Sequence, residues 1–513
     1  MFRKLLLLGF LAAATQSVHG QWLDWTRVTG THLVADPNIG ELDVAEKDYA
    51  VGDFDQDGDP DVVSVRKAPY TVDGPMPNVL FVNENGMLTD QTAALAPGFL
   101  TPDNARDVVA VDINDDGWLD LVIATADNAG VGEQPRVFLN QGLDPGTSTW
   151  LGYIEVFGRL PTLLAAPSQG PKSCAIDAGD VNGDGFPDLY MGDYNSLIED
   201  HLFLNDGFGF FSDQTNLLPG TFALSAFNTR VRVADLNGDG APEILKNTNG
   251  ALNVAYNQGG GSFSLTQNLN VVDTYGFAVG DLDGDGLNDV YVGQDGQDRY
   301  QVNQSAPGAI PIQWQTTQVN GSPLTAGFVG NISIVDLDGD SRNDVVVCDQ
   351  DTDVSGCTRR LAFLRNVDNG GVPVLFDPHP TPTIAQDFGT YDAAIADFDG
   401  DGLLDALVGH CTGTDLYFQV PLVNLFRRGD VNGDGTRDIA DSVYLLTFLF
   451  SQGPSPACRG AGDANDDGSL DVADAVFQLG FLFGGGIPLP PPGPDCGIDP
   501  TPDVLGCVQQ PSC

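Results

Sequence analysis

Short acidic loops recur along this sequence, and the types and spacing of their residues indicate metal chemistry. Seven loops between Asp53 and Asp405 follow the pattern Asp-x-Asp/Asn-x-Asp-Gly-x-x-Asp/Glu, with one exception at the glycine. A hard cation such as Ca²⁺ requires oxygen ligands at alternating positions, a sharp turn at the glycine and a closing carboxylate. The pattern therefore predicts a calcium site in each loop.

The candidate ligands are the first, third, fifth and ninth residues of each loop. In chain order these are Asp53, Asp55, Asp57 and Asp61; Asp112, Asn114, Asp116 and Asp120; Asp180, Asn182, Asp184 and Asp188; Asp235, Asn237, Asp239 and Glu243; Asp281, Asp283, Asp285 and Asp289; Asp336, Asp338, Asp340 and Asp344; Asp397, Asp399, Asp401 and Asp405. Asp, Asn and Gly also favour ordinary turns, but a turn needs only one or two of them. In the sixth loop Ser341 replaces the glycine and must adopt its strained conformation, which makes that loop the weakest.

The overall charge agrees with a metal-dependent protein. The formal net charge is -49, from 71 acidic and 22 basic side chains, so the folded chain repels itself unless counter-ions bind. This charge excludes nucleic acid and anionic membrane surfaces as partners, because phosphate contacts need Lys and Arg. A hydrophobic content of 42% with 28 Phe predicts a large folded core rather than a disordered acidic chain.

The N-terminus has the features of an export signal. Arg3 and Lys4 precede an apolar run, Leu5–Ala14, and small residues follow as far as Gly20. We expect residues 1–20 to be a signal peptide and the mature protein to be secreted or on the cell surface. The run is short for a membrane anchor, and no later segment is long and apolar enough to span a bilayer.

The acidic loops lie inside a longer repeat. Their first residues are separated by 59, 68, 55, 46, 55 and 61 residues, and strand-like runs such as Tyr49–Asp53, Asp61–Val65 and Val79–Asn83 surround each loop. Third strands recur at 137–140, 201–205 and 361–365. Four short strands per repeat are typical of a propeller blade. We therefore predict an all-β, seven-bladed β-propeller over residues 21–426.

The seventh blade lacks a fourth strand in the sequence that follows Asp405. Residues 25–29 resemble the fourth strands at 88–92 and 211–215. We predict that this N-terminal segment completes the last blade and closes the ring, which removes exposed sheet edges. The alternative is that residues 22–47 form a loose tail.

Residues 45–425 resemble the FG-GAP or VCBS repeat family, whose best known members are the integrin alpha-subunit propellers. The resemblance rests on the seven acidic loops and their flanking strands. It implies a seven-bladed propeller with Ca²⁺ in the loops between the first and second strands. Every repeat here carries an acidic loop, whereas integrins load only some, so the integrin ligand does not carry over.

A second unit begins near Asp430 and is an internal duplicate with an offset of 33 residues. Its candidate ligands are Asp430, Asn432, Asp434, Asp438 and Asp441, paralleled by Asp463, Asn465, Asp467, Asp471 and Asp474. Apolar stretches with helical spacing, Ile439–Phe450 and Val472–Phe483, follow the two loops. The pattern predicts a small α domain of two EF-hand-like loop–helix repeats, which raises the total to nine calcium sites.

This duplicate resembles a type I dockerin over residues 429–486. The resemblance implies docking to a cohesin, which ties a secreted module to a scaffold. Pro454, Cys458 and a Pro/Cys-rich tail at 487–513 depart from the family pattern. We expect the Phe and Leu residues of the domain, 427–486, to form its core rather than a docking surface, because two short helices have little apolar area to bury.

All eight cysteines follow the signal segment, which suits an oxidising compartment. We expect Cys458, Cys496, Cys507 and Cys513 to form two disulfides of undetermined connectivity. Two further arrangements involve the propeller: a Cys348–Cys357 bridge, and Cys174 with Cys411 as either a pair between blades or buried thiols.

Two functions from different classes fit these patterns. The first is a non-catalytic binding or adhesion module for a glycan or protein, attached through a cohesin-like scaffold or cell-surface protein. The second is a polysaccharide lyase or glycoside hydrolase. The mature chain has four His and no His-Glu-x-x-His or Gly-x-Ser-x-Gly motif, which favours the first. A cluster of acids with Arg or Lys at the channel mouth, away from the metal loops, would favour the second.

Overall fold

A computed structural model describes residues 23–69, 74–126, 133–163, 171–194, 199–224, 227–294, 296–319, 329–349, 361–367, 376–378, 389–420, 426–451, 453–456, 458–497, 499–501 and 505. They form two compact units, one within Leu23–Pro421 and one within Leu422–Cys513. The predicted signal segment, 1–20, lies outside these residues. Among the helices that are described, none is long and apolar enough to cross a membrane.

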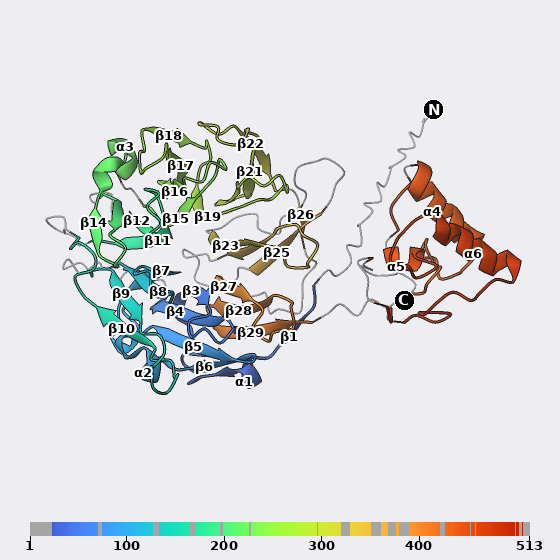
Figure 1. Cartoon of the computed structure of the whole chain (residues 1–513), viewed down its shortest axis with the longest axis horizontal. Coiled ribbons are helices and arrows are strands. Elements are labelled where there is room, and N and C mark those ends of the chain that lie inside the picture. The colour runs from blue at the N-terminus through green and yellow to red at the C-terminus, as the bar shows by residue number, and fades with distance from the viewer. Residues whose placement is uncertain are drawn as a thin grey trace, which may run out of the picture. The chain divides into compact units, whose positions relative to one another are not determined.

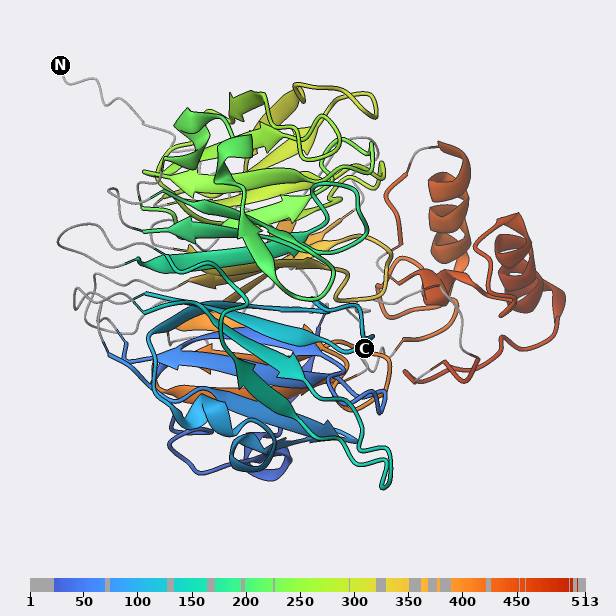
Figure 2. The ribbon, with the colours of Figure 1, turned by 60° about the vertical axis from the view of Figure 1, so that its left-hand side comes forward.

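The first unit is a seven-bladed β-propeller, as the repeat predicted (Figure 1). Each of its seven sheets contains four strands in antiparallel order, and the sheet of blade one gains a fifth, parallel strand. The first strands of successive blades surround the centre of the ring in Figure 1. Figure 2 shows the strands of neighbouring blades lying side by side along their lengths.

Blade one contains β3 (Glu46–Gly52), β4 (Asp61–Lys67), β5 (Val79–Glu84), β6 (Met87–Asp90) and the parallel β2 (Leu33–Val34). Blade two contains β7 (Ala105–Val111), β8 (Asp120–Thr125), β9 (Arg136–Asn140) and β10 (Tyr153–Val156). Blade three contains β11 (Ser173–Gly179), β12 (Asp188–Asp193), β13 (His201–Asn205) and β14 (Phe211–Asp213). Blade four contains β15 (Val231–Ala234), β16 (Glu243–Thr248), β17 (Ala251–Tyr256) and β18 (Leu265–Asn268).

Blade five contains β19 (Thr274–Gly280), β20 (Asp289–Gln294), β21 (Arg299–Asn303) and β22 (Trp314–Gln318). Blade six contains β23 (Val329–Val335), β24 (Asp344–Asp349), β25 (Leu361–Asn366) and β26 (Phe376–Pro378). Blade seven contains β27 (Thr390–Ala396), β28 (Asp405–His410), β29 (Gly413–Gln419) and β1 (Trp25–Arg27). Short helical turns connect some strands: α1 (Thr29–His32), α2 (Thr92–Leu95), η1 (Pro97–Leu100), η2 (Thr215–Leu217) and α3 (Gly220–Ala223).

The hydrophobic core lies between neighbouring blades. Strands β8, β12 and β20 are buried along their whole length, because both faces of each sheet pack against another sheet. Phe54 and Leu80 of blade one, for example, belong to the same cluster as Leu121 and Phe138 of blade two. Each blade therefore depends on its neighbours for burial of its apolar faces.

The N-terminal strand closes the ring. Strand β1 pairs antiparallel with β29, with Trp25 opposite Gln419, so the last blade is completed by the segment that the sequence analysis selected. Arg27 Nε donates a hydrogen bond of 2.8 Å to Asp415 Oδ1. The Trp25 ring is buried and stacks on Phe363 of blade six, with 5.5 Å between ring centroids. The segment is a latch and not a loose tail.

Buried carboxylates link the first strands around the axis. Asp107 accepts the Ile176 N–H of the next blade at 3.0 Å, and Asp392 accepts the Tyr49 N–H at 2.7 Å. Burial raises the pKa of Asp107 to about 6. The Arg230 guanidinium lies 3.5 Å from Asp107 and offsets part of this burial cost. Polar side chains therefore connect blades through the centre of the ring.

The second unit contains α4 (Ile439–Ser451), α5 (Arg459–Gly462) and α6 (Val472–Gly484). Leu445 of α4 and Ala475 of α6 are buried together with Val431. The expectation that the Phe and Leu residues of the domain form its core is wrong for Phe450 and Phe483, which lie exposed. Val443 and Val476 of the same helices are also exposed.

We predict that Trp25→Ala lowers the free energy of unfolding of the propeller by about 3–5 kcal/mol, because it leaves a cavity between blades six and seven. Chemical unfolding of the full chain measures this loss. Phe157→Ala is the control: this side chain is 84% exposed, and its truncation should change stability by about 0.5 kcal/mol or less. Equal stability of the two variants would contradict a latch.

Candidate metal centres

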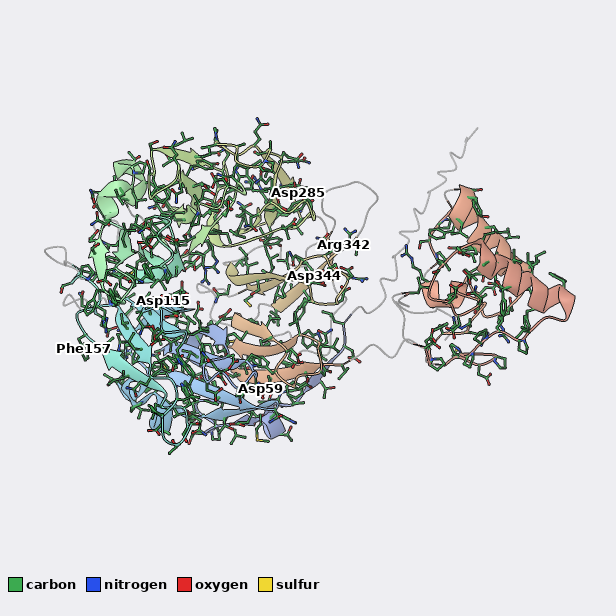
Figure 3. All side chains as sticks on the ribbon, in the orientation of Figure 1. Asp59, Asp115, Phe157, Asp285, Arg342 and Asp344 are labelled. Carbon is green, nitrogen blue, oxygen red and sulfur yellow. The ribbon has the colours of Figure 1, made fainter. Side chains whose placement is uncertain are left out.

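Every predicted propeller loop joins the first and second strands of its blade, so all seven occupy equivalent places in the repeat. Figure 3 labels Asp59, Asp115, Asp285 and Asp344, which belong to four of these loops and lie on different blades. The first strand ends just before the first ligand position, and the second strand begins at the closing acid, as with β3 and β4. The local sequence thus places acids at one end of every blade.

A shared hydrogen bond shapes the loops. In loop one, the Gly58 N–H donates to Asp53 Oδ2 at 3.1 Å, and Gly58 has a φ of +104°, which favours glycine. The sixth residue donates to the first in all nine acidic loops, including the two in the second unit. The nine loops therefore have the same turn.

The carboxylates of a loop converge. In four propeller loops, three acids present oxygen atoms that all lie within 4.8 Å of one another, namely Asp53, Asp55 and Asp57; Asp281, Asp283 and Asp285; Asp336, Asp338 and Asp340; Asp397, Asp399 and Asp405. Loops two, three and four place an Asn at the third position and have the same turn. A donor set made only of oxygen atoms fits a hard divalent cation.

The acids in these loops are electrostatically strained. Burial and the neighbouring Asp57 raise the pKa of Asp55 to about 6. Burial raises the pKa of the closing acids further, to about 8 for Asp61 and about 7 for Asp289. A raised pKa means that the ionised form lacks a compensating charge. A divalent cation held by these residues would supply that charge, so the residues fit the ion.

Each closing acid has a structural role as well. Asp61 Oδ2 accepts the Phe54 N–H of its own loop at 2.9 Å, and its Oδ1 accepts the Asn83 N–H of the third strand at 2.7 Å. The first bond recurs in all seven blades. The closing acid therefore fixes the loop to the third strand of the same blade.

Sequence reasoning missed a set of amides that join one blade to the next. Asn140 Nδ2 of blade two donates to the Phe54 carbonyl of loop one at 2.8 Å. The equivalent bonds in the other blades are Asn83 to Phe398, Asn205 to Ile113, Asn257 to Val181, Asn303 to Leu236, Asn366 to Leu282 and Gln419 to Leu337. We call these seven residues the amide clamps. In the sequence, the feature that marks these clamps is an Asn, or a Gln in blade seven, at the end of each third strand.

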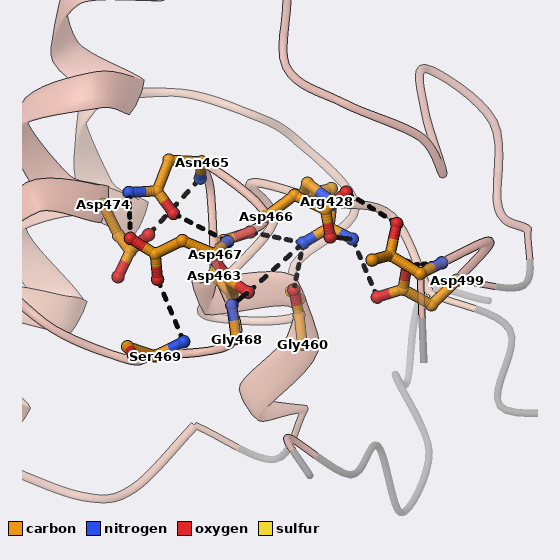
Figure 4. A network of polar contacts seen from close by, with 12 residues as sticks. Arg428, Gly460, Asp463, Asn465, Asp466, Asp467, Gly468, Ser469, Asp474 and Asp499 are labelled. Atoms are coloured by element: carbon orange, nitrogen blue, oxygen red, sulfur yellow. Dashed lines mark hydrogen bonds and ion pairs between the residues drawn. The ribbon is translucent and has the colours of Figure 1, made fainter. Parts of the chain in front are cut away.

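The two loops of the second unit share a further arrangement. Asp441 and Asp474, the last predicted ligand of each loop, are buried and accept the N–H groups of Asp438 and Asp471 at 2.8 Å. Asp471 also caps helix α6. Figure 4 shows the second loop beside the buried Arg428, whose Nη2 donates to Asp466 Oδ1 at 2.8 Å. Each loop is thereby joined to the helix that follows it.

A different cluster lies at the opposite ends of the first strands. Glu46 begins β3, whereas the acidic loop follows the other end of that strand. The Glu46 carboxylate pairs with Lys67 and, at 3.1 Å, with Arg106 Nη1. Arg106 Nε is buried and has no hydrogen-bond partner among the described residues. We call Glu46, Lys67 and Arg106 the mouth cluster.

The cysteine expectations are decided only in part. Cys174 carries a thiol, so it does not pair with Cys411, and burial raises its pKa to about 11. Cys357, Cys507 and Cys513 lie outside the described residues. Cys348 also carries a thiol, so the expected Cys348–Cys357 bridge is wrong. The two C-terminal disulfides stay predictions.

We predict that Asn140→Ala lowers the free energy of unfolding by about 1–3 kcal/mol, because the buried Phe54 carbonyl loses its donor. Thermal or chemical unfolding measures the change. The control is Gln141→Ala, which removes the adjacent, exposed amide and should have little effect. An equal effect of both substitutions would show that the clamp contributes nothing.

No curated protein matches the chain. Among solved structures, an Agrocybe aegerita lectin, described for its recognition of non-reducing terminal N-acetylglucosamine, has 16% identity and a TM-score of 0.44 over 72% of this chain and 86% of that one. BBS1N in complex with ARL6DN has 11% identity and a TM-score of 0.43 over 79% and 99%.

The profile of the FG-GAP-like repeat matches the chain six times. The matched residues are 53–123, 112–191, 180–246, 235–292, 281–347 and 336–408. Each match begins at the first aspartate of an acidic loop and ends in the second strand of the next blade. Together they cover more than half of the chain, which therefore belongs to the FG-GAP-like repeat family.

Proposed function

We propose that this protein is a secreted, calcium-binding and non-catalytic binding or adhesion module, whose propeller presents loops to a glycan or protein. The observation that carries the proposal is that every blade has the same oxygen-lined loop, joined to the next blade by an amide clamp. An ion held in a loop stabilises the interface between blades as well as the loop itself. The ring then forms a rigid support for a binding surface.

Calcium is the cation that this donor set favours. The converging ligands are carboxylate and amide oxygens, without His or Cys, and Ca²⁺ tolerates such flexible, oxygen-rich coordination better than Mg²⁺ does. In loop one the ion would be held by Asp53, Asp55, Asp57 and Asp61. Its chemical contribution is to neutralise carboxylates that otherwise repel one another.

We further propose that the second unit is a dockerin-like attachment domain. Its two loops have the same turn bonds at an offset of 33 residues, and each is followed by a helix of 13 residues. The exposed side chains come in matching pairs, Val443 with Val476 and Phe450 with Phe483. Such a duplicated apolar face suits a cohesin-like scaffold protein.

The mouth cluster bears on the ligand and on the second candidate function. It has two cationic side chains and one acid, in a chain with a net charge of -49. Arg106, whose side chain is 23% exposed, would be the group that pairs with an acidic ligand such as a uronate. The cluster also joins an acid to Lys and Arg away from the metal loops, and burial lowers the pKa of Lys67, which is a property of groups that act in acid–base catalysis. A polysaccharide lyase is therefore the second candidate. The missing catalytic sequence motifs no longer count against it.

Chelation tests the calcium proposal. We predict that a chelator lowers the melting temperature markedly and loosens the second unit first, because that unit has the smaller core. Each ion present at a hundredfold excess over its Kd adds about 2.7 kcal/mol to the folded state. Calorimetric scans with and without chelator measure the melting temperature. Scans that superimpose would contradict the proposal.

A polysaccharide screen separates binding from catalysis. We predict that the calcium-loaded full chain retains an acidic plant or algal polysaccharide and releases no product. Arg106→Gln should weaken retention about tenfold or more, because a charge-assisted hydrogen bond is lost. Arg159→Gln is the control, since this guanidinium lies over Phe210 and outside the mouth cluster. Product release that Arg106→Gln abolishes would establish the lyase instead.

A further inference from the structure

The sixth propeller loop contains a cation of the protein's own. Arg365 Nη2 lies 2.5 Å from Asp338 Oδ2 and 3.6 Å from Asp340 Oδ2. Asp338 and Asp340 are the third and fifth predicted ligands of that loop, and their oxygens converge with those of Asp336 within 4.8 Å. The guanidinium therefore contacts oxygen atoms that a metal ion would need. Among the described propeller loops, no other has an ion pair with Lys or Arg.

The sequence of the other blades shows that this arginine is an exception. Arg365 directly precedes the amide clamp Asn366 at the end of β25. The residues that precede the other six clamps are apolar: Val82, Leu139, Leu204, Tyr256, Val302 and Phe418. At this position an apolar side chain packs between blades. Only in blade six does the chain place a guanidinium there, directed to the acids of its own loop.

Loop six nevertheless keeps the turn of the other loops. The Ser341 N–H donates to Asp336 Oδ2 at 2.8 Å, as the glycine does elsewhere. Ser341 has a φ of +69°, a conformation that is strained for a residue with a side chain. The pair with Arg365 is also shielded, since the Asp338 side chain is only 9% exposed. Shielding from water strengthens an ion pair, and the planar guanidinium suits carboxylates.

We propose that Arg365 takes the place of calcium in loop six, so that the propeller binds six ions rather than seven. This inference rests on the proposed calcium loops and refines their number from nine to eight for the whole chain. A metal ion would have to displace the guanidinium from Asp338 and leave it buried beside a dication. Blade six is thus held by an internal ion pair and does not depend on calcium concentration.

Counting bound ions tests the proposal. At saturating calcium, native mass spectrometry of the full chain should find eight ions on the unsubstituted protein. Arg365→Leu, which introduces the residue found in blades two and three, should bind nine. The matched control is Arg342→Leu in the same loop (Figure 3). It removes the same charge without touching the pair with Asp338, and its count should stay at eight.

The outcomes separate this inference from the proposed function. No bound calcium on any variant would overturn the calcium proposal itself. Nine ions on the unsubstituted protein would overturn only the role of Arg365, and so would a count of eight on Arg365→Leu. If Arg365→Leu does not fold, Arg365→Gln replaces it, since that side chain keeps much of the aliphatic stem and loses the charge. Its expected count is also nine, and eight would overturn the inference.

Discussion

The hydrogen-bonded connection between an acidic loop and the following blade is the interaction on which the propeller depends. The closing acid accepts the N–H of the second loop residue, and the carbonyl of that residue accepts the amide clamp of the next blade. The second residue of each loop is thus bonded both to its own blade and to the next blade. Because these groups are buried, losing one bond inside the folded ring leaves a polar group without a partner, which is costly. The ring closes when Gln419 reaches Leu337 and Asn83 reaches Phe398.

This arrangement explains how so acidic a chain can fold compactly. The metal-loop acids are concentrated at one end of the first strands, where backbone N–H groups donate hydrogen bonds to them. Basic side chains are few, and several arginines neutralise acids locally, as three examples show. Arg230 lies between carboxylates at the axis, Arg428 is buried in the second unit, and Arg365 contacts loop six. Metal ions and guanidinium groups are alternative solutions to the same electrostatic problem.

The opposite end of the propeller has a different composition. The mouth cluster brings two cations to one carboxylate, so the two ends of the first strands differ in charge although they belong to the same strands. The second unit repeats the acidic turn in a helical context, where the last acid of each loop is joined to the start of a helix.

The sequence by itself determined the number of blades, the place of the loops and the closure by Trp25–Arg27, because these follow from a repeated pattern of residue types along the chain. It also contained the amide residue at the end of each third strand, but pattern alone does not state which carbonyl an amide reaches. The pairing of Asn140 with Phe54, of Arg106 with Glu46 and of Arg365 with Asp338 joins residues that are distant in sequence. Only the tertiary structure decided these contacts, since they depend on how neighbouring sheets pack. The exposure of Phe450 and Phe483 was decided in the same way, because helical spacing identifies an apolar face and does not show which residues another helix covers.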